Sequence, residues 1–221
     1  MESADNVNFW DLGDIRLRAA RPSDAAMFAE HFESSPRWVE RAFDRLEFPR
    51  TTADAGHWLA GYFSGGDETG DAKSSGEDCN DKIAASDKIT VGDKIAASDC
   101  RVFIIEESTN RAFIGYIDVW EADARNGVFK TGIKMLGGYA GKGFATRAYA
   151  KVLEFYFDEL RYQKCDIYIY EFNAASLRFH KKFGFVEEGR LRREYYSGGR
   201  FHDSVCLGLT AEEYRATGRL L

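Results

Sequence analysis

The sequence predicts an α+β fold in which a mostly antiparallel sheet of about seven strands is flanked by helices. Two observations predict this class. Most strand-like segments lie after residue 100 and are joined by short turns that are typical of antiparallel hairpins. Amphipathic helices precede and interrupt these strands, and the longest follows a glycine-rich turn at residues 137–146. A chain of 221 residues can bury a full-sized core as one domain.

The N-terminal part predicts one strand followed by helices. Residues 15–20 alternate between apolar and polar side chains, as a half-buried strand does. A proline-containing turn then begins a helix near residues 25–33. Pro36 is suited to the first position of a second helix, which extends to about residue 47. A third helix is expected at residues 52–63.

Residues 64–99 form an insert that differs in kind from the rest of the chain. The insert lacks aromatic residues and contains a six-residue tandem repeat that begins at Asp81, Asp87 and Asp93. It also carries −5 of the formal net charge of −6, so the acidity says little about the substrate. Because each repeat offers one Ile, we expect a mobile excursion, with a local hairpin as the alternative. The prediction is a single domain, residues 1–221, interrupted by this insert.

After the insert the pattern becomes regular. The strands are expected at residues 101–107, 112–121, 128–136, 164–172, 186–196 and 201–209. The strand at 164–172 is so aromatic and β-branched that we expect both of its faces to be covered. Helices are expected at residues 144–160 and 174–183, and residues 210–221 read as a polar tail.

Composition excludes several classes of protein. No apolar run approaches the roughly 18–20 residues that span a bilayer, and the polar, acidic N-terminus is not a signal peptide. Basic residues form no stripe for nucleic acid. The cysteines show neither a Cys-x-x-Cys pair nor a His at metal-ligand spacing. We therefore expect a cytoplasmic protein whose thiols are reduced. We expect it to bind no metal, no membrane and no nucleic acid.

The glycine-rich turn is the first candidate for function. Four glycines lie within residues 137–143, between a strand and a helix. Such a turn directs backbone N–H groups toward one point at the positive end of the helix dipole, which favours phosphate. The P-loop pattern is absent, and the turn lies too late in the chain for a Rossmann fingerprint. A purely structural turn stays open as the alternative.

A second motif gives the turn a more specific meaning. Asn173-x-x-Ser176 and Lys182-Phe-Gly184-Phe185 follow the next strand, 30 residues after the turn. With residues 139–146, they resemble the GNAT family of acyl-CoA-dependent N-acetyltransferases. The similarity runs from residue 15 to about residue 214 without the insert. It is strongest to the branch that contains ribosomal-protein N-terminal acetyltransferases and spermidine N-acetyltransferases.

The resemblance implies a sheet splayed between the strands at 128–136 and 164–172, with acetyl-CoA in the gap. Gly138 stands where the family usually has Arg or Gln, which leaves the amide cradle unchanged. The implied cofactor-binding residues are Lys134, Met135, Leu136, Ala140, Gly141, Lys142, Gly143, Phe144, Ala145, Thr146, Asn173, Ser176, Phe179 and His180. For Asn173 and Ser176, helix capping is an alternative role.

The catalytic residues depart from the family pattern. His180 stands where many members have the Tyr that protonates the leaving thiolate, and packing within the helix is its alternative role. Lys130 stands where many relatives carry a Glu that acts as the general base. Asp118 and Glu121 match acidic positions of the polyamine enzymes, with a solvated strand as the alternative. Other candidates at the acceptor site are Glu171, Tyr170, Tyr195 and Tyr196.

We therefore expect transfer of acetyl from acetyl-CoA to a primary amine, by direct attack in a ternary complex. The acceptor is a polyamine, another small amine or a protein N-terminus. The alternative is a non-catalytic acyl-CoA-binding protein, because Lys130 and His180 replace the usual polar pair. A homodimer is one possibility.

Overall fold

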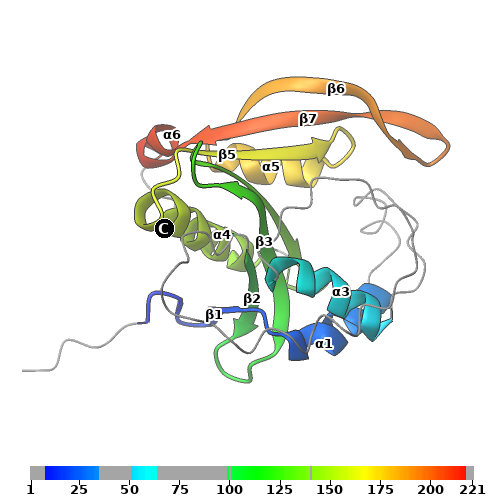
Figure 1. Ribbon diagram of the computed structural model, residues 1–221, viewed down its shortest axis with the longest axis vertical. Helices are drawn as coiled ribbons and strands as arrows, with labels where there is room; N and C mark the ends of the chain where they lie inside the picture. Colours follow the sequence, from blue (N-terminus) through cyan, green and yellow to red (C-terminus); the bar gives the residue numbers. More distant parts are fainter. Residues whose placement is uncertain (1–7, 35–50, 64–98, 100, 140, 218–221) are drawn as a thin grey trace, which may run out of the picture.

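The computed structural model describes residues 8–34, 51–63, 99, 101–139 and 141–217 (Figure 1). The helix expected at residues 36–47 and the insert, apart from Asp99, lie outside the described residues. The described residues build one seven-stranded sheet in the order β1-β2-β3-β4-β5-β7-β6. The arrangement of one domain with an insert stays a prediction.

The elements follow the expected order. The strands are β1 (Ile15–Ala19), β2 (Arg101–Glu107), β3 (Phe113–Asp123), β4 (Val128–Met135), β5 (Lys164–Tyr170), β6 (Val186–Ser197) and β7 (Arg200–Thr210). The helices are α1 (Ala25–Ser34), α3 (Thr52–Phe63), α4 (Phe144–Glu154), α5 (Ala174–Lys182) and α6 (Ala211–Ala216). A 3-10 turn, η1 (Pro22–Asp24), precedes α1, and a π-helical turn, η4 (Phe155–Glu159), continues α4.

The sheet is antiparallel except between β4 and β5. These two strands run parallel and pair at only three positions, the last of which joins Lys130 to Asp166. Both strands continue beyond this position without pairing to each other. The expected splay of the sheet between these strands is therefore confirmed.

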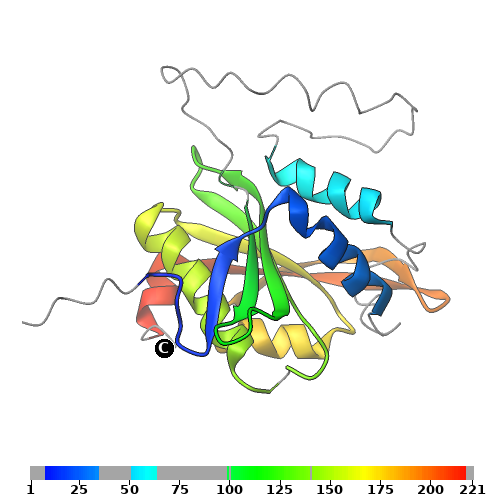
Figure 2. The ribbon, with the colours of Figure 1, turned by 90° about the horizontal axis from the view of Figure 1, so that it is seen from below.

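Helices cover both faces of the sheet (Figures 1 and 2). On one face, α1 and α3 pack on Val102, Ile104 and Tyr116. On the other, α4 and α5 pack on alternate residues of the strands in a larger core. Side chains that are neighbours on one strand therefore point to opposite layers, as the pleat requires.

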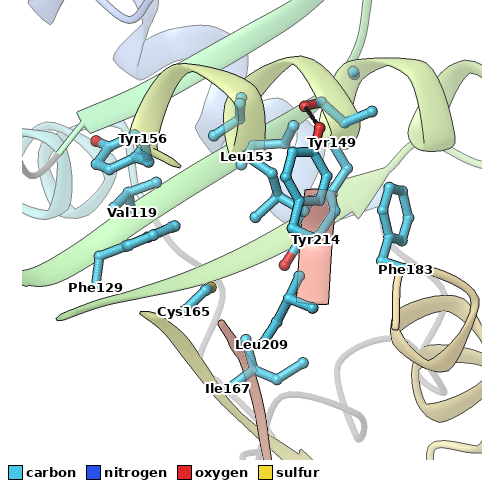
Figure 3. Close-up of a cluster of buried hydrophobic side chains, with 14 of the residues drawn as sticks. Val119, Phe129, Tyr149, Leu153, Tyr156, Cys165, Ile167, Phe183, Leu209 and Tyr214 are labelled. Carbon is cyan, nitrogen blue, oxygen red and sulfur yellow. Dashed lines mark hydrogen bonds between the residues drawn. The ribbon is translucent and has the colours of Figure 1, made fainter. Parts of the chain in front are cut away.

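Aromatic rings fill the centre of the larger core (Figure 3). The Phe129 ring of β4 stacks on Tyr156 of η4 with 4.5 Å between ring centroids. Tyr156 and Tyr162 donate their hydroxyls to the backbone oxygen and the carboxylate of Asp99, the last residue of the insert. The end of the insert is thus tied to the core by two buried tyrosines.

Two expectations for the C-terminal half are wrong. Residues 211–216 are helical, because Thr210 and Glu213 form a capping box and Tyr214 is buried. The strand β5 is covered on one face only. Tyr168 is 44% exposed on the face that carries α1 and α3, and no residue of β5 belongs to the described core beneath these two helices.

Candidate functional site

The site begins where β4 and β5 separate. Beyond Lys130 and Asp166, the edges of the two strands that face each other are left without ladder partners among the described residues. Backbone N–H and C=O groups at such an edge can pair with an extended ligand that carries amides. Lys134, Met135 and Leu136, which were expected to bind the cofactor, lie along this part of β4 and just after it.

The glycine-rich turn lies at the end of β4 and leads directly into α4. Gly138, Gly141 and Gly143 have φ of 89°, 80° and 80°, the left-handed region that favours glycine. Gly143 is the N-cap of α4, and no side chain caps this helix end. A Cβ at any of these three glycines would meet no atom within 4 Å, so the space above the turn is open. Ala140 lies outside the described residues.

The first turn of α4 supplies donors to this open space. Arg147 donates its backbone N–H to the Gly143 oxygen at 3.1 Å, and the N–H groups of Phe144, Ala145 and Thr146 precede this bond. They lie at the positive end of the helix dipole. Lys142 lies 4.9 Å from the Tyr139 ring, which keeps a positive charge beside the turn. The turn therefore fits the pyrophosphate of acetyl-CoA.

The second motif begins α5. Asn173 Oδ1 accepts a hydrogen bond from the Ser176 backbone N–H at 3.1 Å, so Asn173 caps the helix. Phe179 packs against Tyr149 of α4, with 5.4 Å between the ring centroids. The capping role of Asn173 is thus observed. The binding roles expected for Asn173, Ser176 and Phe179 stay predictions.

His180 lies in the core rather than on the surface of α5. It is 4% exposed and packs edge-to-face against Tyr149 and Phe185. Its Nδ1 lies 2.9 Å from the Ser176 backbone oxygen, which fixes the proton on Nδ1. Burial lowers the pKa of His180 to about 4, and the bond to Ser176 opposes this shift. At neutral pH the ring is uncharged, and its buried Nε2 has no partner among the described residues.

Tyr149 of α4 is a buried group that sequence reasoning missed. Its side chain is fully buried, and its hydroxyl makes no hydrogen bond of good geometry to the described residues, although the side chains of Thr131 and Cys165 lie close enough to interact with it. The groups that act on the hydroxyl are Cys165 of β5, Thr131 of β4 and, more weakly, the charge of Asp118. Burial, followed by Cys165, raises the pKa of Tyr149 well above its usual value of 10.0. The hydroxyl therefore keeps its proton at neutral pH.

Asp118 lies on the opposite face of the sheet, below α3. It pairs across the sheet with Gly132, and a Cβ at Gly132 would lie 2.9 Å from Asp118 Oδ1. Glycine at this position therefore leaves the room that the carboxylate occupies. The Tyr62 hydroxyl of α3 donates to Asp118 Oδ2 at 3.1 Å and holds it in place.

Burial makes Asp118 a stronger base than an ordinary aspartate. It raises the pKa of Asp118 from 3.8 to about 6, although the Tyr62 hydrogen bond and the nearby charge of Lys134 act in the opposite direction. The residue keeps a partly exposed edge, while its carboxylate is surrounded by protein. At neutral pH Asp118 is ionised, yet it binds a proton about a hundredfold more tightly than a solvated Asp.

Glu121 lies further along β3 and differs from Asp118. Its side chain is 62% exposed and forms a close ion pair with Lys130 of β4. Lys130 also lies 5.0 Å from the centre of the Tyr168 ring. The Glu121 carboxylate is therefore already neutralised by a charge of the chain.

The remaining candidates at the acceptor site gather at the end of β5. His202 of β7 is buried and places Nδ1 3.2 Å from Glu171 Oε1. Tyr170 packs edge-to-face on Tyr195 at 4.2 Å, and Tyr196 is 59% exposed. Tyr170 and Tyr195 thus pack on each other, and His202 contacts Glu171, whereas Tyr196 lies on the surface. Their catalytic roles stay untested predictions.

The structure thus brings together two of the predicted groups of residues. The glycine-rich turn and the N-terminus of α5 lie on either side of the separation, while Asp118 lies on the opposite face from His180. Tyr62, Thr131 and Tyr149 join them without a local sequence signal, since their roles depend on contacts that sequence spacing does not specify.

Comparisons with known proteins agree with this geometry. The chain matches the acetyltransferase (GNAT) domain over residues 14–186. The SPbeta prophage-derived uncharacterized N-acetyltransferase YokL of Bacillus subtilis is 30% identical over 208 residues, which cover 94% of this chain and 96% of YokL. The spermidine N(1)-acetyltransferase of Vibrio cholerae is 27% identical over 114 residues, 52% of this chain and 65% of that protein.

A solved structure shares the fold. The spermidine N-acetyltransferase of Vibrio cholerae in complex with CoA and spermine has a TM-score of 0.67 at 18% identity, covering 91% of this chain and 98% of that one. The chain belongs to the GNAT family, and it is an N-acetyltransferase. The predicted family, fold class and enzyme class are confirmed, which favours the enzyme over a non-catalytic acyl-CoA-binding protein.

Other expectations concern absences. Among the described residues, no three His, Cys, Asp or Glu side chains are grouped so that they could hold a metal ion. In the same part of the chain, no helix has the length and apolar character that crossing a membrane requires.

The burial of His180 predicts a pH-dependent stability. Because its folded pKa of about 4 lies below the unfolded value of 6.5, the unfolded chain binds the extra proton first. This contribution is complete above pH 6.5 and is lost as the pH falls to about 4. Chemical denaturation of wild type and His180→Asn should show free energies of unfolding that converge by up to about 3 kcal/mol across this window. His57→Asn, at an exposed position, is the control for the loss of an imidazole. Parallel profiles for wild type and His180→Asn would contradict the buried, neutral state.

Proposed function

We propose that this enzyme transfers acetyl from acetyl-CoA to a primary amine by direct attack in a ternary complex. One observation supports this most strongly. The splayed strands separate an open amide turn from Asp118, whose carboxylate lies on the opposite face near the same separation. Acetyl-CoA supplies the acetyl group as a thioester when bound. The residues that would hold it are those of the turn, the first turn of α4 and the free edge of β4.

Asp118 is the base in this proposal. An alkyl ammonium has a pKa near 10.4 and must lose a proton before its nitrogen can attack. The Asp118 carboxylate accepts that proton, and its pKa of about 6 makes the transfer less uphill than for a solvated aspartate. Tyr62 orients the Asp118 carboxylate by its hydrogen bond to Oδ2. The nitrogen–carbon bond then forms as the carbon–sulfur bond breaks. The nitrogen loses its second proton, which replaces the proton that the chain gives to the sulfur, and Asp118 releases the first proton to solvent.

Tyr149 is the better candidate to give the sulfur its proton. His180 is neutral at physiological pH, and its only ring proton is engaged with the Ser176 oxygen. Tyr149 carries a proton on a hydroxyl that has no acceptor among the described residues and lies near Thr131, the first residue of β4 past the separation. The acid role expected for His180 is thus less well supported than that of Tyr149.

An assay with several amines tests whether the enzyme has an amine acceptor and which one it is. A thiol-release assay with spermidine, an N-terminal peptide and a panel of small amines should give turnover with at least one of them. Binding of acetyl-CoA without turnover on any acceptor would contradict the proposal. The relatives named for spermidine motivate the polyamine, and the prophage-derived relative names no acceptor. Location in the cytoplasm and a homodimer stay predictions.

The turn predicts a conformational effect on acetyl-CoA binding. In Gly143→Ala, the new Cβ disfavours φ of 80° and turns the N–H groups at the start of α4 away from the phosphates. We expect the dissociation constant for acetyl-CoA, measured by calorimetry, to be about tenfold larger. Gly198→Ala, with φ of 59° in the β6–β7 turn and equally open space, is the matched control. Equal affinity losses in both variants would exclude a specific role for the turn.

Replacement of Asp118 should separate activity from stability. Asp118→Asn removes the base, so kcat/KM should fall by about a hundredfold or more, and the wild-type fall below about pH 6 should vanish. Because the folded pKa lies above 3.8, wild type loses stability as the pH rises from 3.8 to about 6. The variant should therefore be the more stable protein at pH 8. Asp166→Asn, on β5 beside Lys164, is the control. Retained activity in Asp118→Asn would remove Asp118 from the mechanism.

Removing the hydroxyl from either of two buried tyrosines distinguishes a catalytic role from a packing role. Tyr149→Phe removes a buried hydroxyl that makes no hydrogen bond of good geometry to the described residues, so it should change the free energy of unfolding by less than about 1 kcal/mol, while kcat falls at least about tenfold. Tyr214→Phe removes a buried hydroxyl that donates to the Ala150 oxygen at 3.0 Å. It should cost about 1 kcal/mol of stability and leave kcat unchanged. The opposite pattern would assign Tyr149 to packing alone.

A further inference from the structure

The ammonium group of Lys130 is contacted by the same kinds of group that bind an alkylammonium ligand in a protein. Its Nζ forms a close ion pair with Glu121 of β3 and lies 5.0 Å from the centre of the Tyr168 ring of β5. A carboxylate on one side and an aromatic face on the other are the two groups that bind such cations. The Lys130 side chain is 23% exposed, so most of it is covered by this arrangement.

This cation lies on the same face of the sheet as Asp118. Lys130 pairs across the sheet with Trp120, and Gly132 pairs with Asp118. Lys130 and Gly132 are consecutive residues on this face of β4, and their backbones are therefore about 7 Å apart. That spacing is similar to the distance between neighbouring ammonium groups on a short aliphatic diamine.

The backbone at Glu121 is specialised. Its φ is 46°, a left-handed conformation that a residue with a Cβ seldom adopts, and the register of β3 against β4 shifts between Trp120 and Asp123. Such conformations persist where the surrounding structure requires them. Here the irregularity occurs at the residue whose carboxylate meets Lys130.

The other acids of this face also have cations from the chain itself. Lys164 lies 3.0 Å from Asp166 and 2.8 Å from Glu188. Lys134 is the charge that acts on Asp118. Asp118 is the carboxylate of this face that the proposed function uses as the base.

We propose that Lys130 occupies the place of a second substrate ammonium, so that the acceptor is an amine with a single positive charge. This inference rests on the proposed function and names its substrate class. A small monoamine or a peptide α-amine followed by uncharged residues satisfies it. A polyamine does not, because its second ammonium would meet Lys130 and find Glu121 and Tyr168 already engaged.

The test compares butylamine with putrescine, which has the same carbon chain and a second amine. In wild type, kcat/KM should favour butylamine by about tenfold. Lys130→Met frees Glu121 and Tyr168, and kcat/KM for putrescine should rise about tenfold while that for butylamine changes less than about threefold. Lys130→Arg keeps the cation and should keep the wild-type preference. Adding Glu121→Gln to Lys130→Met should cancel the gain.

Two outcomes overturn the inference and leave the proposed function intact. One is a wild type that acetylates putrescine as well as butylamine. The other is a preference that is the same in Lys130→Met and Lys130→Arg. If no amine is acetylated by any variant although acetyl-CoA binds, the proposed function fails. Calorimetric binding of both amines to the CoA-loaded proteins then decides the Lys130 assignment without turnover, since equal affinities in wild type and Lys130→Met overturn it.

Discussion

The short parallel contact between β4 and β5 is the constraint on which the site depends. The pairing ends at Lys130 and Asp166, although both strands continue. A sheet that stayed paired would satisfy these edges internally and leave no backbone for a ligand. The helices compensate for the lost pairing: α4 and α5 bury aromatic side chains against both strands, so the sheet stays joined through its core. Separation of the strands and dense packing behind them are therefore parts of one arrangement.

The same packing determines which groups can carry protons. His180 and Tyr149 share a buried contact at 5.3 Å, and burial acts on them with opposite chemical consequences. It removes the proton from the imidazole by lowering its pKa and keeps the proton on the phenol by raising it. On the other face, burial strengthens Asp118 as a base. Asp118 and Tyr149 are thus in the protonation states that the proposed reaction needs, whereas the neutral ring of His180 suits packing.

Periodicity predicted most of the fold. The strand at residues 101–107 and the helix at 52–63 have the predicted bounds, because alternation and capping are local signals. The helix at 211–216 was missed although Thr210 and Glu213 form a readable capping box. The open face of Tyr168 could not be predicted, since an aromatic strand residue has the same sequence signal when covered or exposed. The basicity of Asp118 comes from burial that no motif encodes, and the hydrogen bond that opposes it comes from Tyr62, 56 residues away.

Family membership and substrate class rest on different residues, and the two kinds of residue lie in different parts of the sheet. In the proposed function the glycine-rich turn and α5 hold the acetyl donor, and they lie on the side of the sheet covered by α4 and α5. The proposed acceptor face is built by β3, β4 and β5, where Lys130 stands in place of the acidic residue that the resemblance led us to expect. A lysine there changes the sign of the local charge, and Glu121 and Tyr168 bind that lysine instead of a ligand. Similarity to spermidine acetyltransferases therefore carries over to the donor site more directly than to the acceptor.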